Sequence, residues 1–329
     1  MIISKTPYRI SFFGGGSDYP VWYKKYGGEV ISTTIDKYLY ISCRQLPNFF
    51  DHKYRVVYSK VEEVKDINSI KHTVVKKALK KFNIKQNLEI HYDGELPSRS
   101  GVGSSSSFIV GFLNILNNLN NQKLINQKDL ALQSIKFEQE TLKEFVGSQD
   151  QIACAIGGVN NLKFDKNGFS IKKLENKNFF KKLNKNLVLI YTHKQRYSSN
   201  VAKKFVNKIT STKKKEIFDI LECVKIAKQL IINNDLIGFG ELLNYSWQIK
   251  KSLHKEISNS FLDDIYDNAM KNGATGGKIL GAGSGGFFLF YVSEEKQKFF
   301  LNKMKKFTVI PFKFESEGSK IIFKNSQNI

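Results

Sequence analysis

A Gly- and Ser-rich segment joins an extended run to a helical pattern, and this junction constrains the fold more than any other part of the chain. The segment spans residues 96–107 and reads LPSRSGVGSSSS. Residues 87–94, before it, have the composition of a strand, and the apolar pattern at 108–116, after it, has the period of a helix. The sequence therefore predicts a strand, a glycine turn and a helix start in immediate succession.

A helix start of this kind is suited to bind phosphate. The first amide N–H groups of a helix lack intrahelical partners, the helix dipole favours negative charge there, and glycines allow close approach. The hydroxyls of Ser104 to Ser107 add donors and an oxygen ligand for Mg²⁺. The lysine of the G-x-x-x-x-G-K-[ST] loop is missing. A serine linker followed by a helix N-cap explains the serines alone equally well, so two further segments decide.

The composition is that of a folded protein with one large or two ordinary domains. The chain has 329 residues, of which 41% are hydrophobic and 13% aromatic, which is enough to build a core. The N-terminus lacks the apolar centre of a signal peptide. No apolar run approaches the roughly 20 residues of a membrane helix. We therefore expect a cytoplasmic protein without a membrane partner.

The charge is strongly positive, and three explanations exist for it. The 52 Lys and Arg residues against 30 Asp and Glu give a net charge of +22. Nucleic-acid binding, attraction of phosphorylated small molecules, or a solvated surface with no specific role would each account for it. Most of the excess is scattered Lys, and no helix-turn-helix, zinc-finger or aromatic-basic pattern accompanies it. We therefore expect no nucleic-acid partner.

The cysteines and histidines do not indicate a metal site. The three cysteines are far apart in sequence, and the five histidines form no HExxH or HxxxH cluster. We expect buried, reduced thiols and no zinc.

Strand and helix patterns alternate, which predicts a mixed α/β (α+β) fold. The expected strands are residues 2–13, 38–46, 88–92, 159–164, 169–174, 187–192, 287–292 and 309–314. The expected helices are residues 71–82, 106–119, 127–143, 149–156, 200–209, 213–233, 235–251, 259–271 and 294–305. A polar stretch at 175–186 is the expected seam, which divides the chain into domains 1–182 and 183–329.

The glycine segment that comes first in the chain follows the first predicted strand, so the segment at 96–107 is the second in chain order. Residues 14–16 are three glycines, and Ser17 and Asp18 follow them. Glycines there permit positive φ angles and close approach of a ligand, and a carboxylate beyond them is suited to hold a sugar hydroxyl. A tight turn with an Asx cap is the alternative, and the segment taken alone favours that alternative.

A third glycine segment precedes the predicted strand at 287–292. Seven of the fourteen residues at 273–286 are glycine. Because ordering glycine costs chain entropy, such density indicates a backbone pressed against a ligand or against another backbone. A β-bulge or close packing is the alternative.

Taken in this order, the three segments resemble the motifs of the GHMP kinases, the superfamily of galactokinase, homoserine kinase, mevalonate kinase and phosphomevalonate kinase. Its first motif is similar to Pro7-x-Arg9 with residues 14–18, its second to residues 97–105 with Val102 in place of Leu, and its third to residues 276–286. The resemblance runs nearly from end to end. It implies an N-terminal domain like ribosomal protein S5 domain 2, a ferredoxin-like C-terminal domain, ATP and Mg²⁺.

One further stretch narrows the branch. Residues 137–151, FEQETLKEFVGSQDQ, are similar to the sugar 1-kinases of the superfamily, which carry a Glu on one helix and Gly-x-x-Asp-Gln at the start of the next. Within them, the FGGGSDY and GSQDQ stretches most resemble heptose 7-phosphate kinases, with fucokinase-type enzymes close behind. Galactokinases carry Gly-Glu-His-Thr-Asp where this chain has residues 14–18, which argues against galactose.

The resemblance also implies roles for individual residues. Asp150 is the candidate base for an anomeric hydroxyl, and Arg9 is the cation that keeps it ionised and stabilises the phosphoryl charge. Glu138 is the candidate Mg²⁺ ligand with Ser105, whereas Glu140 should face elsewhere on the helix. The predicted ATP and phosphate contacts are Pro97, Gly101, Val102, Gly103, Ser104, Ser105 and Ser106.

The predicted substrate contacts come from three segments. Asp18 is expected to hold sugar hydroxyls, and Arg196, in a loop entering a helix, is a candidate partner for a substrate phosphate. The full set is Gly15, Gly16, Ser17, Asp18, Arg196, Gly281 and Gly283.

The resulting expectation is an ATP-dependent kinase that makes the 1,7-bisphosphate of D-glycero-D-manno-heptose from its 7-phosphate. This product would feed nucleotide-activated heptose and surface polysaccharide. A fucokinase-like kinase of a free sugar and a non-catalytic sugar- and ATP-binding sensor are the alternatives. The sequence leaves the anomer and the oligomeric state open.

Overall fold

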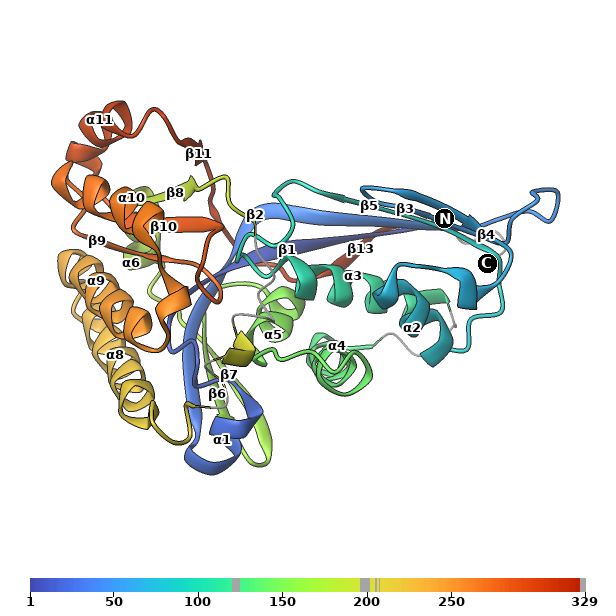
Figure 1. The fold of residues 1–329 in the computed structure, drawn as a ribbon, viewed down its shortest axis with the longest axis horizontal. Coiled ribbons are helices and arrows are strands. Elements are labelled where there is room, and N and C mark those ends of the chain that lie inside the picture. Colours follow the sequence, from blue (N-terminus) through green and yellow to red (C-terminus); the bar gives the residue numbers. More distant parts are fainter. Residues whose placement is uncertain (120–124, 196–201, 205, 207, 326–329) are drawn as a thin grey trace.

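Two sheets with helices packed on them make up the computed structural model, which describes residues 1–119, 125–195, 202–204, 206 and 208–325. Figure 1 shows the larger sheet running from the centre of the molecule to one end, where both termini lie, and the smaller sheet with its helices at the other end. The predicted mixed α/β class is therefore correct.

The first sheet is built around one long strand, β2 (Gly28–Gln45). β1 (Ile2–Phe13) pairs with it along its length, β6 pairs with its first residues and β5 with its last. The path runs β13-β1-β2-β5-β3-β4, and β6, β7 and β12 lie off it. The remaining strands are β3 (Tyr54–Val57), β4 (Val61–Val64), β5 (Leu88–Gly94), β6 (Asn160–Asp165), β7 (Gly168–Lys173), β12 (Phe314–Glu315) and β13 (Lys320–Lys324).

Helices cover one face of this sheet (Figure 1). α3 (Ser104–Leu119) is apolar around most of its circumference and is buried from Ser106 to its end, because it lies between the sheet and its neighbouring helices. The other helices of this region are α1 (Pro20–Tyr26), α2 (Thr73–Lys81), α4 (Gln127–Lys136) and α5 (Gln149–Ile156), with a short 3₁₀ turn at Ile67–Ser69.

The second sheet has the order β11-β8-β10-β9, and all its pairs are antiparallel. β10 (Phe287–Tyr291) is one of the two central strands of this sheet, and all of its residues are buried. The other strands are β8 (Leu187–Tyr191), β9 (Gly276–Ile279) and β11 (Thr308–Ile310). The helices are α6 (Lys177–Lys185), α8 (Lys214–Ile232), α9 (Leu236–Ser252), α10 (Ser260–Lys271) and α11 (Glu294–Lys303), with a 3₁₀ turn at Lys255–Ile257.

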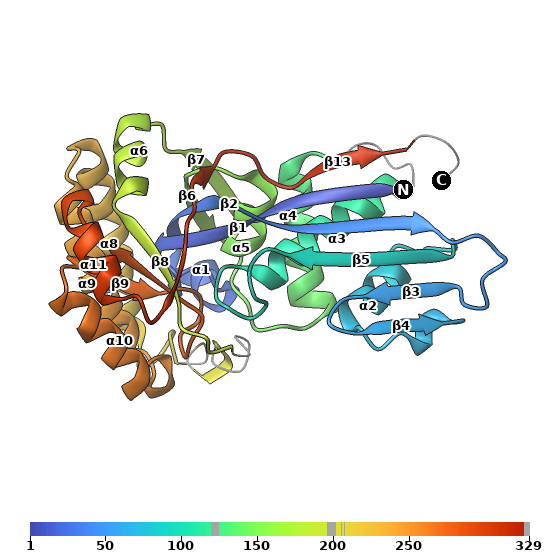
Figure 2. The ribbon, with the colours of Figure 1, turned by 90° about the horizontal axis from the view of Figure 1, so that it is seen from above.

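The chain returns to the first sheet at its C-terminal end, which the sequence analysis did not predict. β12 pairs with β2, and β13 pairs with β1 in a register that places Ile2 opposite Lys324. The boundary between residues 182 and 183 stays a prediction, but strands beyond residue 313 belong to the sheet of the first domain. Figure 2 shows this returning chain crossing from the smaller sheet to β13.

The predicted seam is a helix. α6 occupies most of the polar stretch 175–186, and Phe179, Phe180 and Leu183 on one side of it are buried. Asn176 caps the helix by accepting a hydrogen bond from the N–H of Phe179 at 3.1 Å. Lys and Asn between the apolar positions made the stretch resemble a linker, whereas their spacing is that of an amphipathic helix.

The predicted helix 127–143 changes character at its centre. α4 ends at Lys136, and a π-helical turn follows at Phe137–Thr141. Such turns are frequent at functional sites, since they displace side chains from the regular helical positions. Glu138 lies in this turn and is buried. Within the predicted helix at residues 200–209, residues 202–204 and 206 are helical and residues 208 and 209 form a turn, while the other four positions lie outside the described residues.

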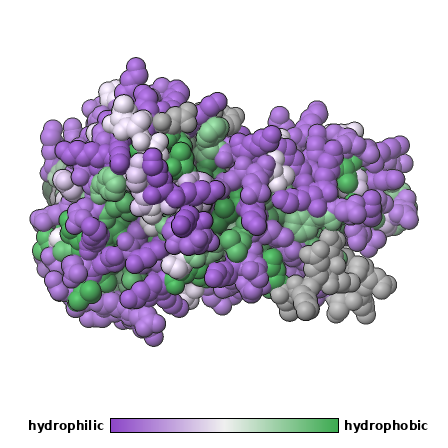
Figure 3. All heavy atoms as spheres, turned by 90° about the horizontal axis from the view of Figure 1, so that it is seen from below, coloured by the Kyte–Doolittle hydropathy of each residue, from purple (hydrophilic) through white to green (hydrophobic). Residues whose placement is uncertain are grey.

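Hydrophilic residues cover most of the face shown in Figure 3, and apolar ones appear as separate patches. None of the helices in the described part of the chain combines the length and the apolar character that a bilayer crossing requires.

The returning chain is pressed against α5, and this contact can be tested at Gly318. A Cβ at this position would collide with the carbonyl oxygen of Ala155 on α5. Gly318→Ala should therefore lower the free energy of unfolding by about 1–3 kcal/mol, as overpacking does. Urea denaturation measures the change.

Gly238→Ala is the control for substitution of a glycine at a helix surface. A Cβ there would meet only side-chain atoms of Asp235 and Leu230, which can move. A loss at Gly318 no larger than that at Gly238 would contradict the close backbone contact.

Candidate functional site

The three glycine segments meet in space. The N–H of Arg9 on β1 donates to the carbonyl oxygen of Val102 at 3.0 Å, which joins the first segment to the second. The N–H of Phe287 donates to the carbonyl oxygen of Ser100 at 3.1 Å, which joins the third segment to the second. A Cβ at Gly286 would collide with that same oxygen, so glycine is required for the approach. The structure thus brings together the segments that the sequence singled out.

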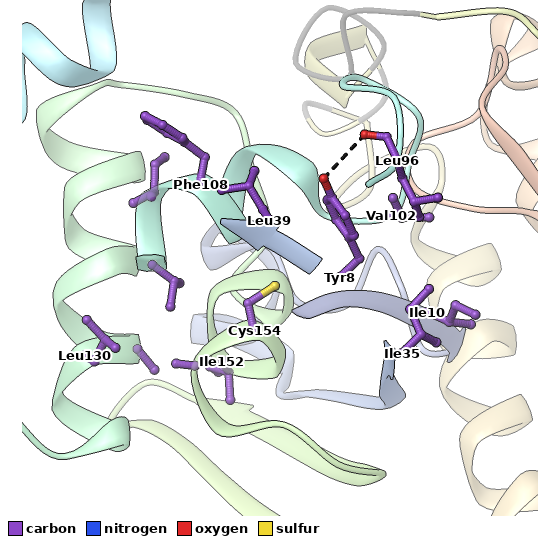
Figure 4. Close-up of a cluster of buried hydrophobic side chains, with 14 of the residues drawn as sticks. Tyr8, Ile10, Ile35, Leu39, Leu96, Val102, Phe108, Leu130, Ile152 and Cys154 are labelled. Atoms are coloured by element: carbon purple, nitrogen blue, oxygen red, sulfur yellow. Dashed lines mark hydrogen bonds between the residues drawn. The ribbon is translucent and has the colours of Figure 1, made fainter. Parts of the chain in front are cut away.

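The second segment rests on the core. Val102 is fully buried, and the hydroxyl of Tyr8 donates to the carbonyl oxygen of Leu96 at 3.4 Å. Figure 4 shows Tyr8 between these two residues and Cys154 of α5. Apolar packing against the core therefore fixes the loop, and its glycines Gly101 and Gly103 line the cavity.

The loop conformation leaves amides available at the start of α3. Gly101 and Gly103 have φ angles of 87° and 77°, which non-glycine residues rarely adopt. The N–H of Ser107 donates to the carbonyl oxygen of Gly103 at 2.8 Å, so the helical ladder begins there. The amides before it are the ones a phosphate can use. Among the predicted phosphate contacts, Gly101, Gly103 and Ser104 to Ser106 line the cavity.

Arg9 and Asp150 form a bidentate ion pair that lines the cavity. Nε and Nη2 of Arg9 donate to Oδ1 and Oδ2 of Asp150, each at 2.6 Å. The Arg9 side chain is 5% exposed and that of Asp150 is 24% exposed. Burial lowers the pKa of Arg9, but the adjacent carboxylate outweighs burial and the pKa is raised. The Asp150 carboxylate therefore lines the cavity, and the Arg9 guanidinium beside it balances its charge.

Glu138 faces the serines of the phosphate loop. Its Oε2 accepts from the hydroxyl of Ser106 at 2.9 Å, and its Oε1 accepts from the hydroxyl of Ser105 at 3.4 Å. Gln151 also donates to Oε2. Burial raises the pKa of Glu138 to about 7, although these hydrogen bonds act in the opposite direction. The structure thus places Glu138 and Ser105 together, as the sequence predicted for a metal site, while Glu140 is outside the cavity lining.

The first segment folds around Asp18. Its Oδ1 accepts from the N–H of Gly16 at 3.0 Å, and its Oδ2 accepts from the N–H of Gln149 at 3.3 Å. Burial raises the pKa of Asp18. Gly15, Gly16 and Asp18 line the cavity, whereas the hydroxyl of Ser17 donates to the carbonyl oxygen of Gly14 at 2.8 Å and supports the turn.

The predicted substrate glycines of the third segment differ in position. Gly281 lines the cavity, whereas Gly283 packs against Ile257, where a Cβ would approach the carbonyl oxygen to 2.7 Å. Close backbone packing, the alternative given for this segment, describes Gly283. Pro97 lines an adjoining cavity rather than this one. Arg196 lies outside the described residues.

Lys278 is a cavity residue that sequence reasoning missed. It lies on β9, is 5% exposed, and its Nζ donates to the carbonyl oxygen of Phe12 at 2.6 Å. Burial lowers the pKa of Lys278 to about 8, and the nearby Arg9 acts in the same direction. Its presence within the third glycine segment was the available signal. Arg99, Gln149 and Lys250 also line the cavity and were missed.

The cavity has two parts that share lining residues. The part lined by Arg9, Asp18 and Asp150 has a volume of about 160 Å³. The other part, of about 530 Å³, has aromatic walls from His72, Tyr92 and Phe108 and shares Arg99, Ser104, Ser105, Glu138 and Val146 with the first. The part that contains the Arg9–Asp150 ion pair, here called the polar chamber, therefore adjoins the aromatic-walled part across the start of α3.

Family comparisons agree with this arrangement. The model of the GHMP kinases N terminal domain matches residues 68–158, and that of the GHMP kinases C terminal domain matches residues 227–309. Together they cover more than half of the chain.

Individual proteins are similar over 70% or more of this chain. D-glycero-alpha-D-manno-heptose 7-phosphate kinase of Campylobacter jejuni is 29% identical over 97% of this chain and 98% of its own. Mevalonate kinase of Methanocaldococcus jannaschii is 28% identical over 70% of this chain and 71% of its own. The crystal structure of a D-glycero-D-manno-heptose 1-phosphate kinase from Bacteriodes thetaiotaomicron has a TM-score of 0.80, with 21% identity over 99% of this chain and 100% of its own, and so shares the fold.

The buried Lys278 should give the stability of the protein a specific pH dependence. Its pKa is about 8 in the folded state and near 10.5 when exposed, so the unfolded chain binds more protons between these values. Its contribution to stability is complete above about pH 10.5 and is lost as the pH falls through 8. Relative to Lys278→Met, the wild type should gain about 2–3 kcal/mol in the free energy of unfolding between pH 7.5 and 10.

Urea denaturation across this pH range measures the difference. Lys172→Met, at an exposed position on β7, is the control and should follow the wild type. Parallel pH profiles for the wild type and Lys278→Met would contradict the buried position of the ammonium group.

Proposed function

Because the chain belongs to the GHMP kinases, phosphotransferases that use ATP on sugar or alcohol hydroxyls, we propose that it phosphorylates the anomeric hydroxyl of D-glycero-D-manno-heptose 7-phosphate. The observation that carries the proposal is the Arg9–Asp150 ion pair at the meeting point of three glycine segments. The likeness to a heptose 7-phosphate kinase over 97% of the chain supports the choice of sugar.

We place the nucleotide across the start of α3. The α- and β-phosphates of ATP bind the amides between Gly101 and Ser106, where the helix dipole favours negative charge. The nucleoside part lies in the adjoining cavity against Tyr92 and Phe108. The γ-phosphate then points toward Asp150 in the polar chamber.

Asp150 acts as the base. Phosphoryl transfer is accelerated mainly by positioning and charge stabilisation, so the base needs a fixed place and a free lone pair. A carboxylate has about four acceptor sites, and Arg9 occupies two of them in this structure. The remaining sites accept the hydroxyl proton of the sugar while Arg9 holds the carboxylate in position.

The donor set near the phosphate loop fits Mg²⁺. Glu138 and Ser105 supply hard oxygen ligands, and Mg²⁺ in kinases is typically held by one or two protein oxygens together with phosphates and water. In the described residues no group of three or more His, Cys, Asp and Glu side chains forms a cage, which agrees with such sparse ligation. When bound, the ion neutralises phosphate charge.

The sugar occupies the polar chamber beside Asp18. Its hydroxyls contact the Asp18 carboxylate and the backbone of Gly15 and Gly16. For the 7-phosphate, Arg196 remains the predicted partner, and Arg99 and Lys278 add positive charge to the chamber.

The Asp150→Asn substitution tests the role of the base separately from nucleotide binding. We expect kcat to fall by about 10²–10⁴, since general-base catalysis contributes that much, while ATP affinity changes little. Coupled ATP-consumption kinetics and nucleotide titration measure the two effects. Asp165→Asn, at an exposed site on β6, is the matched control and should turn over normally. Wild-type turnover by folded Asp150→Asn would refute the assignment.

The sugar phosphate is tested by kinetics on paired substrates. We expect kcat/KM for heptose 7-phosphate to exceed that for unphosphorylated heptose by at least about 100-fold, because two charge-assisted hydrogen bonds contribute roughly 1.5–3 kcal/mol each. L-fucose is the third substrate. Equal turnover of heptose and its 7-phosphate, or a preference for L-fucose, would show that heptose 7-phosphate is not the substrate. The absence of ATP consumption with every sugar would indicate the non-catalytic sensor.

A further inference from the structure

A lysine-rimmed cavity lies apart from the catalytic chamber, and we propose that it binds a nucleoside diphosphate. The cavity has a volume of about 650 Å³, within the range of small-molecule sites. It is an open cavity lined by α6, the end of β7 and the returning segment 312–316. Figure 2 shows α6 and β7 beside this returning chain.

The floor of the cavity is apolar and partly aromatic. Phe312 and Phe314 lie side by side with ring centroids 6.3 Å apart, and Phe180 of α6 is also part of the lining. Val159 and Leu174 complete the apolar lining. Flat aromatic groups bind well against such surfaces, because ring faces pack closely and exclude water.

The rim of the cavity carries unusually dense positive charge. Five of its fourteen lining residues are Lys, whereas Lys and Arg together make up 52 of the 329 residues of the chain. The five are Lys173, Lys177, Lys181, Lys185 and Lys313. The acidic lining residue is Glu315, and its carboxylate accepts hydrogen bonds from Tyr38 and from the amides of Ser316 and Glu317.

The lysines of α6 are exposed and repel one another when no anion is bound. Lys177, Lys181 and Lys185 follow one another at intervals of four, so they lie on one face of the helix, where like charges repel. Within the described part of the chain, Lys177 and Lys181 form no ion pair, and Lys185 has an exposed one with Glu294 at 3.4 Å. A ligand with two or more negative charges offsets this repulsion.

The two halves of the cavity together select the ligand class. Inorganic phosphate would leave the aromatic floor uncovered, and an uncharged aromatic molecule would leave the lysines unpaired. A nucleoside diphosphate combines a flat base with two phosphates on a short sugar spacer, and its size suits the volume.

The cavity is separate from the site of phosphoryl transfer. It shares no lining residue with either part of the catalytic cavity. Gly158, in its wall, follows the C-terminal end of α5, whereas Asp150 lies in the first turn of that helix. At 1.5 Å per residue, these ends are roughly 12 Å apart. A nucleotide can therefore occupy each site at once.

Calorimetric titration with GDP tests the proposal on the full-length protein. A saturating non-hydrolysable ATP analogue first fills the catalytic site, and GDP is then added. We expect one further equivalent to bind. Lys177→Ala combined with Lys181→Ala should weaken GDP binding by at least tenfold.

The control removes the same charge from the same elements. Lys172→Ala combined with Lys182→Ala changes exposed lysines of β7 and α6 that do not line the cavity, so GDP affinity should be preserved. Guanosine and pyrophosphate, titrated separately, should each bind much more weakly than GDP. Circular dichroism verifies that both double variants are folded.

Four results would overturn the proposal. They are the absence of GDP binding once the analogue is present, an equal loss in both double variants, pyrophosphate binding as tightly as GDP, and binding of single-stranded RNA or an acidic peptide at these lysines in place of GDP. The last would assign the cavity to a macromolecule.

Discussion

The buried guanidinium of Arg9 is the interaction on which the rest of the site depends. Its side chain is 5% exposed, and three of its nitrogens reach Asp150 and the carbonyl oxygen of Gly101, while its backbone N–H reaches Val102. One residue therefore fixes β1, the phosphate loop and α5 relative to one another. Removing either partner of a buried pair typically costs about 3–5 kcal/mol, because the remaining charge is left unpaired. The geometry that we propose for phosphoryl transfer is therefore also the geometry that satisfies this buried charge.

Three further ionisable groups near the ion pair are buried, which disfavours their charged forms. Burial raises the pKa values of Glu138 and Asp18 and lowers that of Lys278, so each is displaced toward its neutral form. A core built for stability would contain apolar side chains here. Their concentration in one chamber is typical of a functional site, where bound cations and phosphates supply the missing counter-charges.

The sequence revealed those parts of the molecule whose signal is local. β1 and α5 have the predicted bounds because each contains an uninterrupted pattern ending at glycines. Arg9, Ser105, Glu138 and Asp150 could be identified from their spacing and family resemblance. Lys278 had only its position within the third glycine segment as a signal, and its side chain resembles those of 51 other Lys and Arg residues until the fold buries it. β13 is short and paired with residues more than 300 positions away, so nothing near it predicts its partner.

That distant pairing bears on catalysis through α5. At its first turn the helix carries Asp150, and at its last turn it meets the returning chain. The N–H of Ser319 donates to the carbonyl oxygen of Cys154 at 2.8 Å, and the N–H of Gly158 donates to that of Glu315 at 3.0 Å. Because an eight-residue helix has little stability of its own, its position is set by what holds its ends. The start of the chain supplies Arg9 at one end and its final strands supply the contacts at the other, so Asp150, the proposed base, is placed only once both ends of the polypeptide have folded together.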